Sequence, residues 1–174
     1  MNSELMISIL ELTVSIFIGI FTLFLTYYIF TKIYLSRFPK SNLYKNNAFL
    51  IFLGGVMISM GYLLSGIISP LTSTLDILIS SKPETLSLIL EYSKFLGLFL
   101  VLGLILGGLI NYLSYLIFSN LTRTVDEFEE INKGNSGVAF IVSVIAITIA
   151  VFCKEPFLVV LESFIPYPEL PRLF

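Results

Sequence analysis

The sequence predicts an all-α, polytopic membrane protein with four transmembrane helices. Of its 174 residues, 56% are hydrophobic and only 13% are charged, a composition typical of membrane proteins rather than of soluble domains. In addition, four apolar stretches each approach or exceed the roughly 20 residues that a helix needs to cross a bilayer. These stretches lie near 12–35, 48–69, 95–118 and 136–153.

None of the four stretches carries a charged side chain in its interior. A single Lys, Arg or Asp at the centre of a span would disfavour membrane insertion by roughly 2.5 to 3.5 kcal/mol, so all four are expected to insert. The chain has one cysteine, Cys153, and no histidine. An intramolecular disulfide, a histidine-based catalytic triad and the usual zinc sites are therefore excluded, and no metal or other cofactor is expected.

Two transitions from polar to apolar sequence share the pattern Lys, any residue, Asn. An offset of 88 positions aligns Lys45 with Lys133 and Asn47 with Asn135 without a gap. Apolar sequences match one another easily, so the matches between polar residues are the informative ones. They predict one transmembrane domain over residues 1–174, built as two parallel two-helix repeats.

The first repeat is expected over about 5–80 and the second over about 92–166. Because each repeat holds two spans, both insert with the same orientation. Pro70 follows the second span and Pro156 follows the fourth, and short interfacial helices are expected after each of these spans. The proline-rich tail, 166–174, is incompatible with a regular helix.

The loops predict the orientation of the chain in the membrane. The loops after the first and third spans carry basic residues, and cytoplasmic loops are enriched in Lys and Arg. Both loops are therefore expected in the cytoplasm and both termini outside it. The basic residues are Lys32, Arg37, Lys40 and Lys45 in the first loop, and Arg123 and Lys133 in the second.

Three asparagines are candidates for a polar site. Asn47 and Asn135 begin the second and fourth spans, and each is either a helix N-cap, satisfying an amide that lipid cannot, or half of a polar site at the cytoplasmic mouth. Asn111 lies deep in the third span. It either forms an interhelical hydrogen bond or lines a hydrated path.

Small residues recur at helical spacing on two of the spans, and small side chains let helix backbones approach closely. The pattern predicts two packing seams, one for contacts within the chain and one for association into a homo-oligomer. The residues are Gly103 and Gly107 on the third span, and Gly55, Ser59 and Gly66 on the second.

The loop after the third span is acidic where its counterpart after the first is basic. Three interpretations are open: a solvated run of charge, pairing with the basic loop across repeats or protomers, and docking of a basic cytosolic protein. The acidic residues are Asp126, Glu127, Glu129 and Glu130.

The stretches "LYKNNAFLIFLGGVMISMGYLLSG" and "EEINKGNSGVAFIVSVIAI" resemble the two repeats of the YjfL-like family of small bacterial inner-membrane proteins. The resemblance covers most of the four-helix region. It implies a four-span protein of the bacterial inner membrane without known catalytic residues. Members of that family are often encoded near phage-shock-type envelope-stress proteins and ATP-grasp peptide ligases, which implies a role in membrane maintenance, stress response or defence.

Together these observations favour a non-enzymatic, homo-oligomeric scaffold or sensor in the lipid bilayer, with no nucleic-acid partner. The alternative is a pore-forming subunit of an ion channel or small transporter, in which Asn111 and the Asn47 and Asn135 pair line the path. No ionisable residue lies at mid-depth to support proton coupling or voltage gating, although a pore lined by backbone or hydroxyl groups needs none. An enzyme would need a nucleophile or metal cluster that the sequence does not offer.

Overall fold

A computed structural model of the chain describes residues 3–81, 85–121 and 126–165. The predicted tail, 166–174, and Arg123 lie outside this part. Every regular element in the described part is helical, as predicted. The elements are α1 (Ser3–Arg37), η1 (Leu43–Lys45), α2 (Asn47–Leu64), η2 (Ser65–Ile67), α3 (Ile68–Ser81), α4 (Thr85–Leu121), α5 (Glu127–Asn132) and α6 (Ser136–Glu162).

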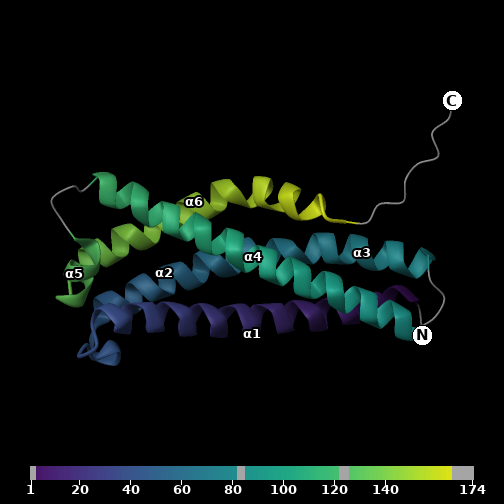
Figure 1. The fold of residues 1–174 in the computed structure, drawn as a ribbon, viewed down its shortest axis with the longest axis horizontal. Helices are drawn as coiled ribbons and strands as arrows, with labels where there is room; N and C mark the ends of the chain where they lie inside the picture. Colours follow the sequence, from purple (N-terminus) through teal and green to yellow (C-terminus); the bar gives the residue numbers. More distant parts are fainter. Residues whose placement is uncertain (1–2, 82–84, 122–125, 166–174) are drawn as a thin grey trace.

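The described part contains four stretches that are long and apolar enough to cross a membrane, which confirms the predicted spans. They are Ser8–Arg37, Asn47–Ser81, Leu86–Asn120 and Ser136–Glu162. Successive spans run in opposite directions along the bundle (Figure 1). The connection between α1 and α2 therefore lies with α5 at one end, here called the loop end. The end of α3 and the start of α4 lie at the opposite end, the far end.

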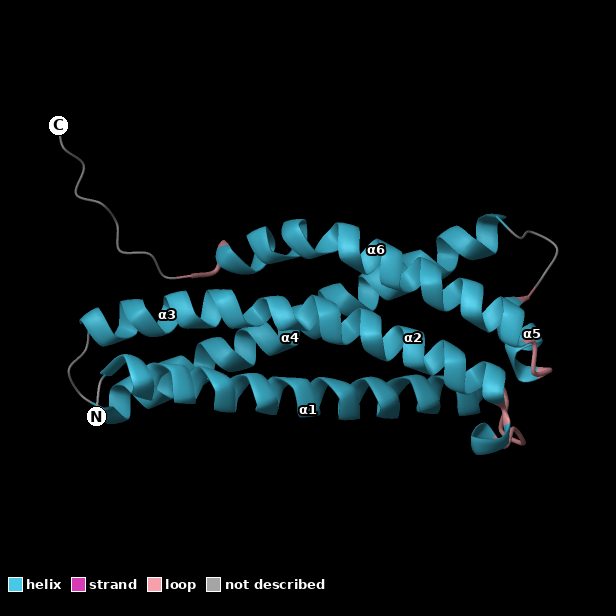
Figure 2. Cartoon of the chain, turned by 180° about the vertical axis from the view of Figure 1, so that it is seen from behind, coloured by secondary structure: helices cyan, strands magenta, loops and turns pink. Residues whose placement is uncertain are grey.

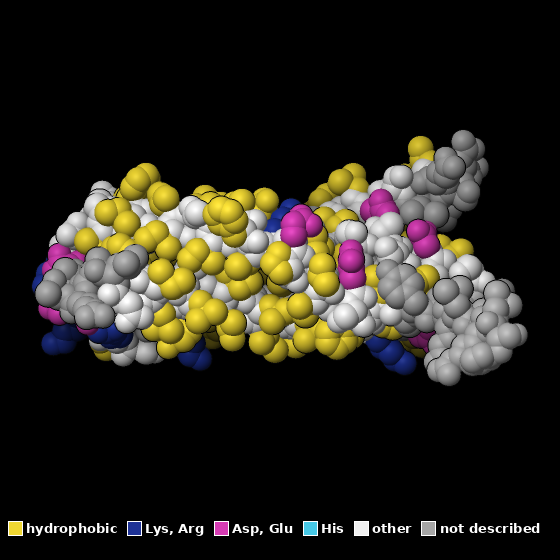
Figure 3. All heavy atoms as spheres, turned by 90° about the horizontal axis from the view of Figure 1, so that it is seen from above, with side chains coloured by type: hydrophobic (Ala, Val, Ile, Leu, Met, Phe, Trp, Pro, Cys, Tyr) yellow, Lys and Arg dark blue, Asp and Glu magenta, His cyan; other side chains and the backbone are white. Residues whose placement is uncertain are grey.

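The helices are longer than a bilayer requires. The 35 residues of the span Asn47–Ser81 extend about 50 Å at 1.5 Å per residue, against roughly 30 Å of hydrocarbon. On the face seen in Figure 3, apolar side chains cover the surface next to the loop end, while charged side chains gather at the loop end itself and again over the far half. Over the far half of this face, charged side chains therefore lie among apolar ones.

Short interfacial helices were predicted after the second and fourth spans; α3 follows the second span, and the segment after the fourth is part of α6. α3 continues from α2 after the single 3₁₀ turn η2. Pro70 has no N–H for the carbonyl of Gly66, which loosens the regular helix at this point without ending it. Pro156 lies inside α6, which continues to Glu162, because packing and local adjustment make an internal proline tolerable in such helices.

α2 is the central helix and lies between α1 and α6 when seen from behind (Figure 2). Of the most apolar 18-residue stretch of its span, 56% is buried, whereas the corresponding share is 17–28% in the other three spans. α2 and α6 run parallel and approach closely at Gly55, where an added Cβ would lie 2.3 Å from the Cβ of Ser143. The Ser143 hydroxyl shares its proton between the carbonyl of Ala139 in its own helix, at 2.8 Å, and that of Ile51 on α2, at 3.1 Å. Ser59 Oγ donates to the carbonyl of Ala146 at 3.3 Å. Close backbone contact and interhelical hydrogen bonds thus join the two helices.

Candidate functional site

The small residues predicted to form packing seams lie at contacts between helices of this chain. A Cβ added to Gly103 would lie 2.7 Å from Ile67 Cδ1, and one added to Gly107 would lie 3.0 Å from Met60 Sδ. The predicted seam on α4 therefore packs against α2 and η2. The full set is Gly55, Ser59, Gly66, Gly103 and Gly107.

Asn111 continues the same face of α4 toward the loop end and is only 5% exposed. Its Nδ2 donates to the carbonyl of Gly107, within its own helix, at 3.0 Å. Its Oδ1 is buried and accepts no hydrogen bond from the described part of the chain. Such an unsatisfied acceptor costs roughly 1–3 kcal/mol. The predicted interhelical hydrogen bond of Asn111 is therefore absent from the described contacts.

Asn111 lines a cavity of about 390 Å³, here called the Asn111 cavity. Helices α1, α2, α4 and α6 all contribute to its lining, and Phe128 of α5 lines it from the loop end. The Phe128 ring centroid lies 5.6 Å from that of Phe52 and 4.9 Å from that of Tyr115. Gly108 leaves part of the wall open, since a Cβ there would meet nothing within 4 Å. The cavity thus combines a wall of aliphatic and aromatic side chains, two of them tyrosines, with one amide.

At the loop end, three side chains link α1, α2 and α5; we call Tyr34, Asn46 and Asn132 the loop junction. Tyr34, which is 1% exposed, donates its hydroxyl to Asn132 Oδ1 at 3.0 Å. Asn46 Nδ2 donates to the carbonyl of Ile131 at 2.9 Å and to Tyr34 Oη at 3.3 Å. These hydrogen bonds hold the ends of three helices together at the loop end of the bundle.

The N-caps of α2 and α6 are Asn46 and Asn135. Asn46 Oδ1 accepts from the N–H of Phe49 at 3.0 Å, and Asn135 Oδ1 accepts from that of Val138 at 3.2 Å. The predicted cap Asn47 is instead the exposed first residue of α2. The sequence did not single out Asn46 because both asparagines of the "KNN" motif are favourable N-caps. The hydrogen bond from Asn46 to the carbonyl of Ile131, which lies far away in the sequence, favours Asn46 as the cap.

The structure gives no hydrogen bond between Asn47 and Asn135, and each has its own surroundings. Asn47 lines an open, mostly polar hollow of about 430 Å³ together with Lys45 and Lys133. Asn135 Nδ2 donates to Glu130 Oε2 at 3.0 Å. Asn111 lies elsewhere, in the Asn111 cavity, so the three asparagines do not converge.

The acidic residues after α4 have different environments. Asp126 is the N-cap of α5, accepting from the N–H of Glu129 at 3.1 Å, and its other oxygen pairs with Arg37 at the end of α1. The Arg37 guanidinium also lies over the Phe128 ring, 5.5 Å from its centroid. Glu127 is fully buried. The basic and acidic loops are thus joined within one chain by the Arg37–Asp126 pair.

Glu130 forms a local network with two neighbours. It accepts from Asn135 and, at 3.1 Å, from Lys133 Nζ, which also lies 3.3 Å from Glu129 Oε1. The hydrogen bond from Asn135, with help from Lys133, lowers the pKa of the Glu130 carboxyl. The same carboxylates raise the pKa of the Lys133 ammonium, Glu130 contributing most. The network stabilises the turn between α5 and α6.

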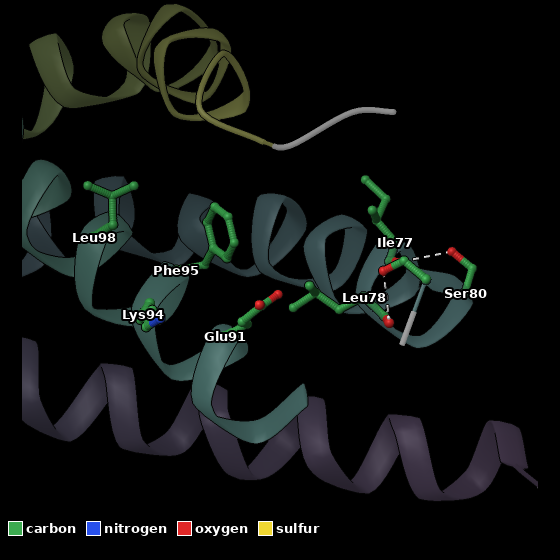
Figure 4. Close-up of a pocket in the computed structure, with 8 residues that line it drawn as sticks. Ile77, Leu78, Ser80, Glu91, Lys94, Phe95 and Leu98 are labelled. Carbon is green, nitrogen blue, oxygen red and sulfur yellow. Dashed lines mark hydrogen bonds between the residues drawn. The ribbon is translucent and has the colours of Figure 1, made fainter. Parts of the chain in front are cut away.

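A second hollow, of about 680 Å³, lies at the far end between α3 and α4 (Figure 4). Its wall is mostly apolar, and Glu91 and Lys94 contribute charge from α4. The hydroxyls of Ser80 and Ser81 donate to the carbonyls of Ile77 and Leu78 in their own helix, at 2.8 and 3.2 Å. Both hydroxyls therefore have a hydrogen-bond partner within their own helix, whereas Asn111 Oδ1 has none in the described part of the chain.

The described residues contain no group of three or more Asp, Glu, His or Cys side chains that could hold a metal ion. Cys153 is a free, partly buried thiol on α6.

The comparisons with known proteins identify a family and no characterised relative. The family model described as Domain of Unknown Function (DUF350) matches residues 4–155. No curated protein and no solved structure gives a significant match. The matched range includes the Asn111 cavity, the loop junction and most of the four spans.

Proposed function

The chain belongs to the DUF350 family, a domain family of unknown function, and from this premise we propose that it is a non-enzymatic, homo-oligomeric membrane scaffold or sensor. The loop junction is the observation that carries the proposal. Tyr34, Asn46 and Asn132 connect α1, α2 and α5 through side-chain hydrogen bonds. A shift of α1 against α2 within the bilayer would therefore move α5, which presents acidic side chains to the surface.

The surface of α5 supports recruitment of a cytosolic partner. The side chains of Glu129 and Asp126 are 56% and 40% exposed, so both remain accessible to a basic protein. Glu127 is buried and the Glu130 side chain is only 29% exposed, whereas Glu129 and Asp126 keep more of their surface free although they pair with Lys133 and Arg37. The docking surface we propose is therefore centred on Glu129 and Asp126 rather than on all four acids.

An open face of α2 supports self-association. Gly54 and Gly61 are seven residues apart, hence on one helix face, and a Cβ at either would meet nothing within 4 Å. Faces with small residues allow close helix contact inside a membrane. Gly103 and Gly107 of α4 already pack against α2 and η2 within the chain, so we propose that the open pair Gly54 and Gly61 contacts a second copy.

The cellular setting that we propose is the bacterial inner membrane, with both termini outside the cytoplasm and a role in membrane maintenance, stress response or defence. Two observations support it: the resemblance to YjfL-like proteins and the position of Arg37, Lys40, Lys45 and Lys133 at the loop end. Basic residues retain that end in the cytoplasm.

A pore-forming subunit remains the second candidate, and Asn111 is the observation in its favour. Its unpartnered Oδ1 offers a polar group at membrane depth, and intramembrane polar groups commonly mark transport paths. However, the Asn111 cavity has Phe128 at its loop end and an apolar wall. A pore would therefore need walls supplied by other copies of the chain.

Reconstitution of the purified protein tests the two candidates together. Subunits would be counted by single-molecule photobleaching in vesicles, and conductance would be recorded in planar bilayers. The scaffold or sensor predicts several bleaching steps, fewer steps for Gly61→Leu, and no conductance. Gly97→Leu is the matched control, because Gly97 is equally open but lies on α4.

Two results would overturn the proposal. Single-step bleaching at every protein density would remove the homo-oligomer. Ion-selective conductance that changes in Asn111→Leu would replace the scaffold with the channel.

A further inference from the structure

We propose that the Asn111 cavity binds an uncharged lipid that carries a free hydroxyl group, and that this hydroxyl donates a hydrogen bond to Asn111 Oδ1. The proposal goes beyond the scaffold or sensor function and does not depend on it, since it rests on the geometry of the cavity alone.

The orientation of the Asn111 amide specifies a hydrogen-bond donor. Nδ2 donates to the carbonyl of Gly107, and turning the amide over would set Oδ1 against that carbonyl, two acceptors facing each other. Oδ1 is therefore the group left over, and it is buried without a partner in the described part of the chain. A ligand with a hydroxyl supplies the missing donor.

The wall of the cavity specifies an uncharged ligand. Among the described residues that line it, none is Lys, Arg, Asp or Glu. The Arg37 guanidinium, which lies over the ring of Phe128, is already paired with Asp126. A charged group in this cavity would lose its hydration without gaining a partner. Phospholipid head groups and fatty-acid carboxylates are therefore disfavoured.

The position of the cavity specifies a molecule dissolved in the bilayer. Ile33 of α1 and Tyr112 of α4 line it and are 53% and 59% exposed on the surface of the bundle. A ligand therefore reaches Asn111 from the lipid between these two helices. The volume, about 390 Å³, is at the small end of ligand pockets. The cavity accommodates the hydroxyl-bearing end of a lipid, and the rest of the chain stays in the bilayer.

A pair of photoreactive probes tests the proposal on the full chain in phosphatidylcholine vesicles. One probe is a long-chain alcohol with a diazirine, and the other is its methyl ether, which has the same shape but no donor. After irradiation, labelled residues are mapped by mass spectrometry. We expect the alcohol to label residues around the cavity roughly fivefold more than the ether, the effect of one hydrogen bond.

Three variants control the experiment. Asn111→Leu should abolish the preference for the alcohol. Gly108→Leu places a side chain in the open part of the wall and should reduce labelling by both probes, whereas Gly97→Leu, an open site on the same helix outside the lining, should not. Displacement of the alcohol by diacylglycerol or by an isoprenoid hydroquinone then identifies the class of lipid.

Equal labelling of the unmodified protein by alcohol and ether would overturn the proposal, and would indicate that water satisfies Asn111. Labelling around the cavity that persists in Gly108→Leu would also overturn it, because the probes would then lie on the outer surface. A preference that disappears in Asn111→Leu while the protein keeps its thermal stability would support it.

Discussion

Gly55 and Ser143 lie in contact where α2 packs on α6, and they are 88 positions apart in the chain. This is the same offset at which the first half of the sequence aligns with the second. A two-fold axis between two repeats brings equivalent residues together on the axis. The contact therefore supports the proposed pair of parallel repeats, and predicts that the pseudo-two-fold axis passes between α2 and α6 at this level.

Gly55→Ala is expected to destabilise the protein. The new Cβ would lie 2.3 Å from Ser143 Cβ and 2.8 Å from its Cα, so the two helices must separate, at a cost of about 1–3 kcal/mol. Denaturant unfolding in detergent micelles measures the change. Gly97→Ala is the matched control, since its Cβ also meets open space and it lies outside the proposed contact with a second copy. Equal stabilities of the two variants would contradict the close packing of α2 on α6.

Asn46→Ala is expected to lower stability by about 1–2 kcal/mol, because it removes both an N-cap and a hydrogen bond to α5. Asn47→Ala, one residue later, should change stability little, because Asn47 is exposed and does not cap α2. Hydrogen exchange should also show faster exchange in α5 of Asn46→Ala only. Similar exchange in the two variants would mean that the loop junction does not couple α2 to α5.

The four spans were predictable from the sequence because apolar length and the absence of charge determine insertion. Their ends were less predictable. The run after Pro70 has the composition of an interfacial helix, yet α3 continues α2 because one 3₁₀ turn is enough to accommodate the proline. Similarly, the cap of α2 is decided by the contact of Asn46 with Ile131, which joins segments 85 residues apart.

The candidate site was only partly predictable from the sequence, because it too depends on contacts between segments that are far apart in the chain. Asn111 was identified because a polar residue deep in a span is exceptional. The cavity around it depends on how α1, α2, α4, α5 and α6 pack together, and no local pattern contains that information. Pairing of the basic loop with the acidic one was one of three interpretations that the opposite charges left open, and the selection of Arg37 and Asp126 required the fold.

The pKa of Glu130 is expected below its ordinary value of 4.5. Because the folded-state pKa is lowered, the stabilisation from ionised Glu130 is present above pH 4.5 and is lost as the pH falls through the folded-state pKa. Lys133 behaves in the opposite sense, since its pKa is raised from 10.5. Its contribution is present below that value and is lost as the pH rises through the raised one.

Carboxyl NMR titration of the protein in micelles measures the Glu130 pKa directly. Asn135→Ala should return it toward 4.5, because the hydrogen bond from Asn135 is the main cause of the shift. An unchanged pKa in that variant would assign the shift to Lys133 instead.

The ion pair of Arg37 with Asp126 is expected to contribute about 0.2–1 kcal/mol, the range for exposed pairs. The side chains are 50% and 40% exposed, so the coupling should decline as salt rises. A double-mutant cycle with Arg37→Gln and Asp126→Asn measures it, since asparagine preserves the N-cap of α5. A coupling energy of zero at low salt would mean that the pair does not hold the two loops together.

Asn42→Cys and Ser163→Cys are expected to react with a membrane-impermeant maleimide from opposite sides of the membrane. Asn42 lies at the loop end and Ser163 follows α6 toward the other end, and both are exposed. In a Cys153→Ser background each variant has one thiol.

Because the basic residues gather near Asn42, the positive-inside rule predicts that this position faces the cytoplasm. The maleimide should therefore label Ser163→Cys in intact cells, and Asn42→Cys only after the cells are permeabilised. The reverse pattern would invert the proposed orientation and move the acidic surface of α5 away from any cytosolic partner.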